Sequence, residues 1–176
     1  MTHSRFYTAK GDHGDTARLG GEARMSKSDL LLEVVGVVDE ATSAIGMARA
    51  VVEEVALKAT LRTVQEHFVH LMAHLSATPD VRERHPGPGM DDLAWLEARI
   101  ADLEAGLPPL HAFVLPGDSL PGAALHVART AVRRAERGVV ALAEAEPGID
   151  ALILAYLNRL SSLLFVAALH ADRSYK

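Results

Sequence analysis

The 176-residue sequence has no cysteine, few aromatic residues and no excess of positive charge. The lack of cysteine excludes disulfide bonds and thiolate chemistry. The net charge of −5 argues against a general binder of nucleic acids or anionic membranes, because the overall field repels both. Any anionic ligand is therefore expected to be held by a local cluster of basic side chains.

Aromatic residues make up only 5% of the chain, whereas hydrophobic residues make up 49%, which favours one domain of aliphatic helices. The opening residues, MTHSRFYTAKGDHG, lack the apolar core of a signal peptide, so we expect a cytoplasmic protein. Residues 151–169 are long enough to span a membrane. Because Asn158, Arg159, Ser161 and Ser162 lie in the middle of this stretch, we interpret it as a buried helix.

Apolar residues recur at helical spacing along most of the chain, and strand signals are weak. Ser28 or Asp29 can cap the first helix, and Ser119 can cap the fourth, which tolerates Pro121 in its first turn. We predict five helices, at about 29–54, 57–77, 91–105, 119–144 and 149–170. Their mostly short connections predict an all-α, up-and-down bundle.

The predicted bundle covers residues 28–176, and residues 1–27 precede it as a polar segment. A segment this polar buries little area by itself, so we expect a ligand or a neighbouring subunit to order it. The stretch 79–90 contains three prolines and two glycines and is predicted to be a loop between helices.

The loop GDHGDT, residues 11–16, offers backbone N–H groups and a threonine hydroxyl that suit an anion. Lys10 and Lys27 could add positive charge, and Asp12 or Asp15 could help to hold a magnesium ion that accompanies a nucleotide. The loop lacks the spacing of a P-loop and follows no strand, so an ordinary polar turn remains the alternative interpretation.

The predicted fourth helix carries Arg129, Arg133 and Arg137 at intervals of four residues, which places them on nearly one face. Guanidinium groups suit phosphate oxygens, so this stripe could hold a polyphosphate. The alternatives are a solvated face or ion pairs with Asp39 and Glu40. Asp39 and Glu40 lie in the apolar run of the first helix, where we expect them to be buried. A buried carboxylate would need a partner, either within the chain or across a subunit boundary.

Three histidines, His67, His70 and His74, lie along one side of the predicted second helix, where His70 and His74 could chelate a metal. There is no obvious acidic third ligand, so polar-face or surface histidines are the alternative. Trp95 and its neighbouring leucines are predicted to lie in the core.

Six segments carry a resemblance to a known family. They are YTAKGDHGDT (7–16), RMSKSD (24–29), VVGVVDEATSAIG (34–46), FVLPGDS (113–119), HVARTAVRRAERGVV (126–140) and YLNRLSSLLF (156–165). In this order they resemble the ATP:cob(I)alamin adenosyltransferases of the propanediol-utilisation type. That resemblance implies homotrimers of five-helix bundles, with active sites between adjacent subunits.

The resemblance also implies an ATP site. On one chain the site would include Tyr7, Thr8, Gly11, Asp12, Gly14, Thr16 and Lys27. Arg133, Glu136 and Asn158 would contribute from the neighbouring chain or the bundle, and Mg²⁺ would be held mainly by the ATP phosphates.

The same resemblance implies a corrinoid site and catalytic residues. Phe113 and Phe165 would be walls of the corrinoid pocket, and Phe113 would exclude the dimethylbenzimidazole ligand from the lower face of the ring. Asp39 would contact the corrinoid site and pair with Arg129 across the subunit interface. Arg129, Arg133 and Asp39 would be the catalytic residues.

The implied reaction transfers the 5′-deoxyadenosyl group of ATP to the cobalt of cob(I)alamin and releases triphosphate. Its partners would be a flavoprotein reductase and an adenosylcobalamin-dependent enzyme, with no nucleic acid and no membrane involved. The cofactor performs the difficult chemistry, which explains why the sequence contains no evident protein nucleophile.

The nucleotide loop differs from the family pattern at Lys10, His13 and Asp15. An aspartate beside triphosphate would weaken ATP binding unless it faced the metal or solvent. One alternative function is therefore a non-catalytic carrier or sensor of adenosylcobalamin or ATP. Another is a structural helical oligomer whose charges form only interface salt bridges.

Overall fold

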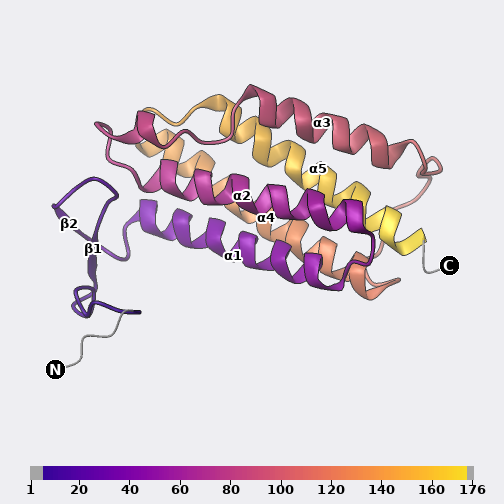
Figure 1. The fold of residues 1–176 in the computed structure, drawn as a ribbon, viewed down its shortest axis with the longest axis horizontal. Coiled ribbons are helices and arrows are strands. Elements are labelled where there is room, and N and C mark those ends of the chain that lie inside the picture. Colours follow the sequence, from indigo (N-terminus) through magenta and orange to yellow (C-terminus); the bar gives the residue numbers. More distant parts are fainter. Residues whose placement is uncertain (1–5, 174–176) are drawn as a thin grey trace.

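The computed structural model describes residues 6–173, and the parts of the predicted segments at 1–5 and 174–176 lie outside them. Five long helices form an up-and-down bundle preceded by a short β-hairpin (Figure 1), as the helical pattern predicted. The helices are α1 (Leu30–Val51), α2 (Val55–Ser76), α3 (Met90–Glu104), α4 (Leu120–Ala145) and α5 (Ala151–Arg173). The shorter elements are β1 (Asp15–Ala17), β2 (Arg24–Ser26) and the 3₁₀ helix η1 (Arg82–Arg84).

Polar caps set the beginnings of the helices. The Asp29 carboxylate accepts a hydrogen bond from the Leu31 N–H at 3.0 Å, and the Ser119 hydroxyl accepts one from the Gly122 N–H at 3.0 Å. The predicted start of α5 at residue 149 is two residues early. Asp150 accepts from the Leu152 N–H at 2.9 Å and caps the helix there.

The first predicted helix was too long at its other end. It ends at Val51, and Val52 and Glu54 have extended backbone before α2 begins at Val55. The apolar and helix-favouring residues around this break gave no sequence signal for it, because neither proline nor glycine is present between 51 and 55.

Helix α4 occupies the centre of the core, packed against both α1 and α5, while α2 packs on α1 and α3 on α5. Within residues 6–173, α5 is the one helix long and apolar enough to cross a membrane, but 56% of its most apolar stretch is buried in the bundle. The prediction of a buried helix is thus confirmed. Trp95 is only partly buried and packs against the edge of the core.

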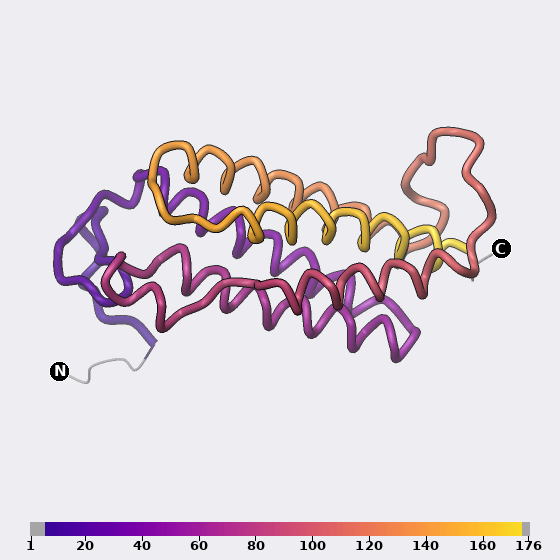
Figure 2. The backbone as a smooth tube through the Cα atoms, turned by 90° about the horizontal axis from the view of Figure 1, so that it is seen from above, coloured from indigo at the N-terminus to yellow at the C-terminus, as the bar shows by residue number. Residues whose placement is uncertain are grey.

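The β-hairpin was not predicted. β1 and β2 pair antiparallel, with Thr16 opposite Met25, and three-residue strands are too short to show an alternating pattern. Just after β1, the Leu19 N–H donates to the Ser76 carbonyl at 3.0 Å and the Thr78 N–H donates to the Leu19 carbonyl at 2.9 Å. The hairpin therefore joins the bundle where α2 ends, and it projects from that end (Figures 1 and 2).

Candidate functional site

The predicted nucleotide loop, defined as residues 6–14 and called the nucleotide loop below, is held closed by Lys27. This lysine lies in the turn that follows β2. Lys27 Nζ donates to the Gly11 carbonyl at 2.7 Å, and the Lys27 N–H donates to the Gly14 carbonyl at 2.9 Å. Gly14 has a φ of +79°, in the left-handed region that favours glycine. Four of the predicted residues, Gly11, Gly14, Thr16 and Lys27, thus lie in or directly beside the hairpin, and the other three, Tyr7, Thr8 and Asp12, lie in the loop that leads into β1.

Asp15, which departs from the family pattern, is paired inside the same hairpin. Arg24 Nη2 lies 2.6 Å from Asp15 Oδ1 and also donates to the Lys10 carbonyl at 2.6 Å. The hydrogen bond from Arg24 lowers the pKa of Asp15. The carboxylate is therefore ionised but paired with a cation, which offsets its repulsion of any anion that the loop could hold.

Within residues 6–173 the stripe of Arg129, Arg133 and Arg137 forms no ion pair with a carboxylate, and the ion pair on this helix belongs to the neighbouring Arg134. Arg134 forms an ion pair with Glu40 of α1, whereas Arg133 and Arg137 are exposed and Arg137 Nη1 donates to the Arg133 carbonyl at 3.0 Å. Arg129 is partly buried, and its Nε lies 3.4 Å from Nδ1 of His126. Free guanidinium groups therefore remain on the outer surface of α4.

Two predicted ATP residues meet on this surface. Asn158 Nδ2 donates to Glu136 Oε1 at 3.1 Å, which brings α5 and α4 together one turn from Arg133. Asp39 behaves differently from the prediction that its carboxylate would be buried: it is exposed on α1. In the described part of the chain it forms no ion pair with an arginine, because Glu40 takes that role.

The second site element is the segment 105–118, which links α3 to α4. Its Phe113 side chain is 92% exposed, and the segment lines a cavity of about 900 Å³ together with Leu169, Asp172 and Arg173 of α5. Phe165 does not line this cavity. It is partly buried, with its ring centroid 6.0 Å from that of His126.

A buried polar group fixes the end of this segment. The Ser119 hydroxyl donates to Asp172 Oδ1 at 2.5 Å, and both residues are buried. A Cβ on Gly122 would collide with the same oxygen, so a larger residue fits there only if the buried Asp172 side chain moves. His126 is also buried, and that burial together with Arg129 lowers its pKa. No sequence motif had singled out Asp172.

The three histidines of α2 do not form a metal site. His67 Nδ1 lies 2.9 Å from the Tyr156 hydroxyl and its Nε2 lies 3.2 Å from Asp92, while His74 Nδ1 lies 2.9 Å from the His85 carbonyl. Across residues 6–173, no three His, Cys, Asp or Glu side chains are grouped so that they could hold a metal. Two of the histidines therefore serve internal hydrogen bonding, and His70 is exposed.

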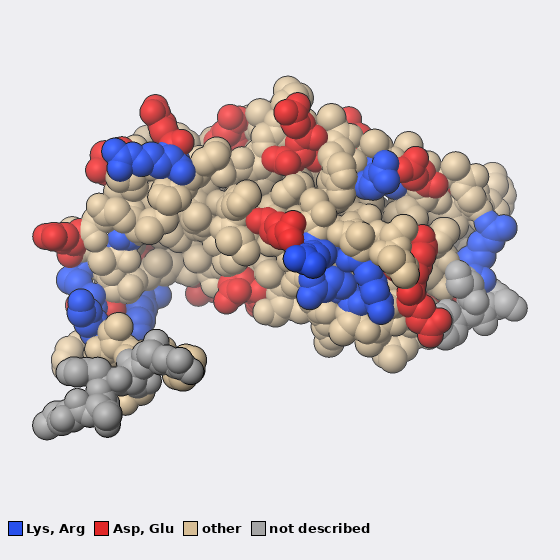
Figure 3. Space-filling model, viewed as in Figure 1, with Lys and Arg blue, Asp and Glu red and all other residues tan. Residues whose placement is uncertain are grey.

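The candidate site residues are spread along the whole molecule. The β-hairpin lies at one end of the bundle and the segment 105–118 at the other (Figures 1 and 2). Between these two ends, α4 carries the exposed Arg133 and Arg137, and in the space-filling view of Figure 3 the hairpin protrudes from the bundle. One chain thus presents three separate parts of a site.

A known protein family matches a stretch of the chain that includes all three of these parts. The family described as cobalamin adenosyltransferase matches residues 6–171. The corrinoid adenosyltransferase of Mycobacterium tuberculosis is 41% identical over 167 residues, covering 93% of this chain and 86% of the relative. That of Bacillus subtilis is 38% identical over 168 residues, covering 93% and 84%.

A solved structure is also similar to this chain over nearly its whole length. A variant of the PduO-type ATP:corrinoid adenosyltransferase of Lactobacillus reuteri, complexed with cobalamin and ATP, superposes with a TM-score of 0.87 at 32% identity. The match covers 96% of this chain and 94% of that one. From the matched segment, the identity and the shared fold, this chain belongs to the cobalamin adenosyltransferase family.

Proposed function

We propose that this protein transfers the 5′-deoxyadenosyl group of ATP to the cobalt of a reduced corrinoid and releases triphosphate. The observation that carries the proposal is the match over 96% of the chain to an enzyme solved with both cobalamin and ATP. The geometry agrees with it, because a cation-lined loop, an arginine surface and an open cavity are separate in sequence yet belong to one fold.

The reaction needs positioning more than it needs a protein nucleophile. Cobalt(I) supplies both electrons of the new Co–C5′ bond and becomes cobalt(III), while the C5′–O bond breaks and triphosphate leaves with its electron pair. The chain therefore has to bind both substrates, bring C5′ to the cobalt and stabilise the departing charge. Exposed Arg133, beside the Glu136–Asn158 pair, is suited to the phosphates.

The active site is completed by a neighbouring chain in this proposal, within a homotrimer. Lys10, Gly11 and Gly14 make their hydrogen bonds inside the hairpin, which projects away from the bundle (Figure 1). The segment carrying Phe113 is at the opposite end, so the two halves of the reaction meet only if another copy supplies one of them. Exposed and unpaired Asp39 is available for Arg129 of that copy.

The corrinoid is proposed to lie at the cavity of about 900 Å³ beside Phe113. An aromatic side chain that is 92% exposed on a loop is poorly explained by folding alone, and it could cover the lower face of a corrin ring. Excluding the axial base there would make the cobalt easier to reduce. Phe165 would contribute a more distant wall, through its contact with His126.

Mg²⁺ is proposed to arrive with ATP and to be held mainly by the phosphates, as is usual for this ion. Asp15 is engaged by Arg24, so exposed Asp12 is the loop carboxylate left to supply an oxygen. The protein is proposed to act in the cytoplasm, where a flavoprotein reductase would provide the electron and an adenosylcobalamin-dependent enzyme would take the product.

An anaerobic assay tests the proposal. Chemically reduced cobalamin, Mg²⁺ and ATP are mixed with the protein, and the light-sensitive Co–C product is followed by its absorbance, with ATP omitted as the control. We expect ATP-dependent product. Tight corrinoid binding without product would instead support the carrier or sensor function, and neither binding nor product would support a purely structural oligomer.

Arg133→Ala separates catalysis from folding. Because Arg133 is exposed, the variant should keep its thermal midpoint yet lose at least about 100-fold in turnover, roughly 2.7 kcal/mol of transition-state stabilisation. Arg62→Ala, which removes an exposed α2 pair with Glu66, is the matched control and should turn over normally. An unchanged rate in Arg133→Ala would remove Arg133 from the site.

A further inference from the structure

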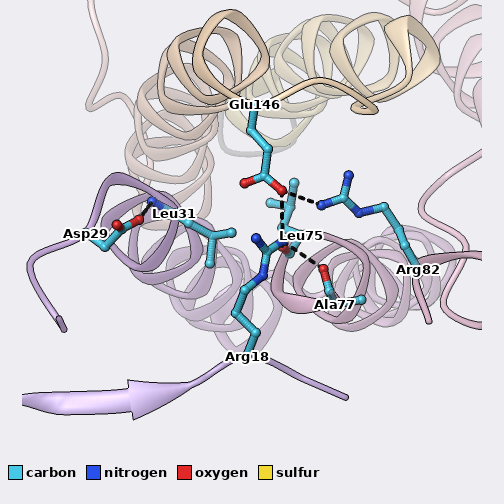
Figure 4. Close-up of polar contacts among 7 residues, drawn as sticks. All are labelled: Arg18, Asp29, Leu31, Leu75, Ala77, Arg82 and Glu146. Carbon is cyan, nitrogen blue, oxygen red and sulfur yellow. Dashed lines mark hydrogen bonds and ion pairs between the residues drawn. The ribbon is translucent and has the colours of Figure 1, made fainter. Parts of the chain in front are cut away.

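The hairpin that carries the nucleotide loop is docked on the bundle through two consecutive residues, Arg18 and Leu19. Leu19 makes the two backbone hydrogen bonds to the end of α2, and Arg18 reaches past it into the bundle (Figure 4). Neither residue belongs to a motif that carries the family resemblance. Arg18 nevertheless follows β1 directly and lies only two residues after Thr16. The position of Arg18 therefore determines where β1 is attached to the bundle.

Arg18 joins three elements at once. Its Nη2 donates to the Ala77 carbonyl at 2.8 Å, just beyond the last turn of α2, and lies 3.0 Å from Glu146 Oε1 after α4. Arg82 Nη2, from η1, lies 2.8 Å from the same oxygen. Figure 4 shows the guanidinium groups of Arg18 and Arg82 both reaching the same carboxylate oxygen of Glu146.

The electrostatics of the C-terminal ends of α2 and α4 explain the pairing of these charged residues. Carbonyl groups at the end of α2 attract a cation such as Arg18, whereas an acidic residue at the C-cap of α4 is unfavourable unless it is paired. Burial alone would raise the pKa of Glu146, but the hydrogen bonds from Arg18 and Arg82 outweigh it and lower that pKa. Glu146 is therefore held as an anion between two cations.

The cluster is shielded from solvent, with side-chain exposures of 19% for Arg18, 25% for Glu146 and 11% for Arg82. Charged hydrogen bonds in such a setting have more defined directions than surface ion pairs. Inside the hairpin, the Arg24–Asp15 pair and the Lys27–Gly11 hydrogen bond connect the strands to the loop. A shift at Arg18 would therefore be transmitted to residues 6–14.

We propose that Arg18, Glu146 and Arg82 form a positioning cluster that holds the nucleotide loop in its ATP-binding direction. In this proposal the three residues act through the hairpin and not by contact with a substrate, and the inference rests on the proposed function of this loop. A pre-positioned loop loses less conformational freedom when ATP binds. Disrupting the cluster should therefore weaken ATP binding while leaving corrinoid binding unchanged.

The test uses the full chain with Arg18→Gln, Glu146→Gln and the double variant, and Arg62→Ala as the control for loss of a surface ion pair. Three quantities are measured: amide hydrogen exchange at Leu19 and Thr78, ATP affinity by calorimetry, and the KM values for ATP and cob(I)alamin. We expect faster exchange, about tenfold weaker ATP binding and an unchanged corrinoid KM. Arg18→Lys, which keeps a cation, should recover part of the ATP affinity.

The double variant sharpens the test. If Arg18 and Glu146 act through each other, the double variant should bind ATP about as weakly as either single variant, instead of showing the product of two losses. Unchanged exchange in the single variants would overturn the docking role. Faster exchange with unchanged ATP affinity, or equal losses for ATP and corrinoid, would overturn the positioning role.

The proposed function fails in a different way from this inference. A wild-type protein that binds ATP but yields no adenosylated corrinoid would refute adenosyl transfer, and the comparison of ATP affinities would still decide the role of the cluster. A wild-type protein that does not bind ATP would overturn both.

Discussion

At one end of the bundle, an ion pair between Arg18 and Glu146, which are far apart in sequence, helps to dock the β-hairpin, whereas at the other end a short hydrogen bond from Ser119 to Asp172 helps to fix the segment 105–118. The first contact joins oppositely charged side chains that are mostly but not fully shielded from solvent, so salt screens it in part. The second is buried and is screened much less. The proposed ATP and corrinoid halves of the reaction therefore depend on different physical interactions and can be perturbed separately.

Gly122→Ala should have the largest effect on stability. The new methyl group would displace the Asp172 carboxylate, whose oxygen lies 2.0 Å from the site of the Cβ, and so break the bond to Ser119. We expect a loss of about 3 kcal/mol in the free energy of unfolding, measured by denaturant titration. Gly36→Ala, where no atom lies within 4 Å, is the control and should be neutral or stabilising. Equal effects would show that Gly122 is not a close-packed position.

Phe113→Ala should separate function from folding at the same end. The side chain is 92% exposed, so its loss should change stability by less than about 0.5 kcal/mol. Adenosylation of cob(I)alamin should fall about 100-fold, because a wall of the proposed corrinoid pocket is removed. Val69→Ala, which removes an exposed apolar side chain of α2 outside this cavity, is the control, and an equal loss in both variants would argue against a specific role for Phe113.

Asp172→Ala should lower the free energy of unfolding by about 2 kcal/mol, because the buried Ser119 hydroxyl loses its acceptor. The corrinoid KM should rise while the ATP KM stays constant, the opposite of the pattern expected for Arg18→Gln. Asp172→Asn keeps an acceptor oxygen and should recover most of the stability. A rise in the ATP KM alone would contradict the independence of the two ends.

Acid should also lower the stability of the folded protein, through one histidine near each end of the bundle, but by a smaller amount. Burial lowers the pKa of His74 near the hairpin and of His126 near the segment 105–118, below the ordinary value of 6.5. Below pH 6.5 the unfolded chain therefore binds protons before the folded chain does, so stability falls as the pH falls until the folded-state pKa is passed. Unfolding measured at pH 7 and pH 5.5 should show this fall, and His74→Gln and His126→Gln should each reduce it.

Local patterns predicted most of the bundle. Apolar spacing located the five helices, Asp29 and Ser119 marked their caps, and prolines marked the connections. The three-residue strands and the break after Val51 were missed because neither has a distinct sequence signal. Asp39 was expected to be buried because its neighbours are apolar, yet its side chain faces outward from α1.

The site was predictable where its residues are adjacent in sequence. The nucleotide loop and the arginine stripe are each visible as a motif, and the structure brings Glu136 and Asn158 together. The supporting residues Arg18, Glu146 and Asp172 were not predicted, because their partners are 128 or 53 residues away and no local pattern records such a pairing.

The distance along the chain between Arg18 and Glu146 also predicts the order in which parts of the protein reach their final positions. The hairpin precedes every helix in the sequence, but its ionic partner follows α4, 128 residues later. Closing so long a loop is slow compared with forming the helices, and it requires α2 and α4 to be packed already. The hairpin is synthesised before the helices but is therefore expected to reach its final position only after they have packed, and competence to bind ATP would report that the bundle is complete.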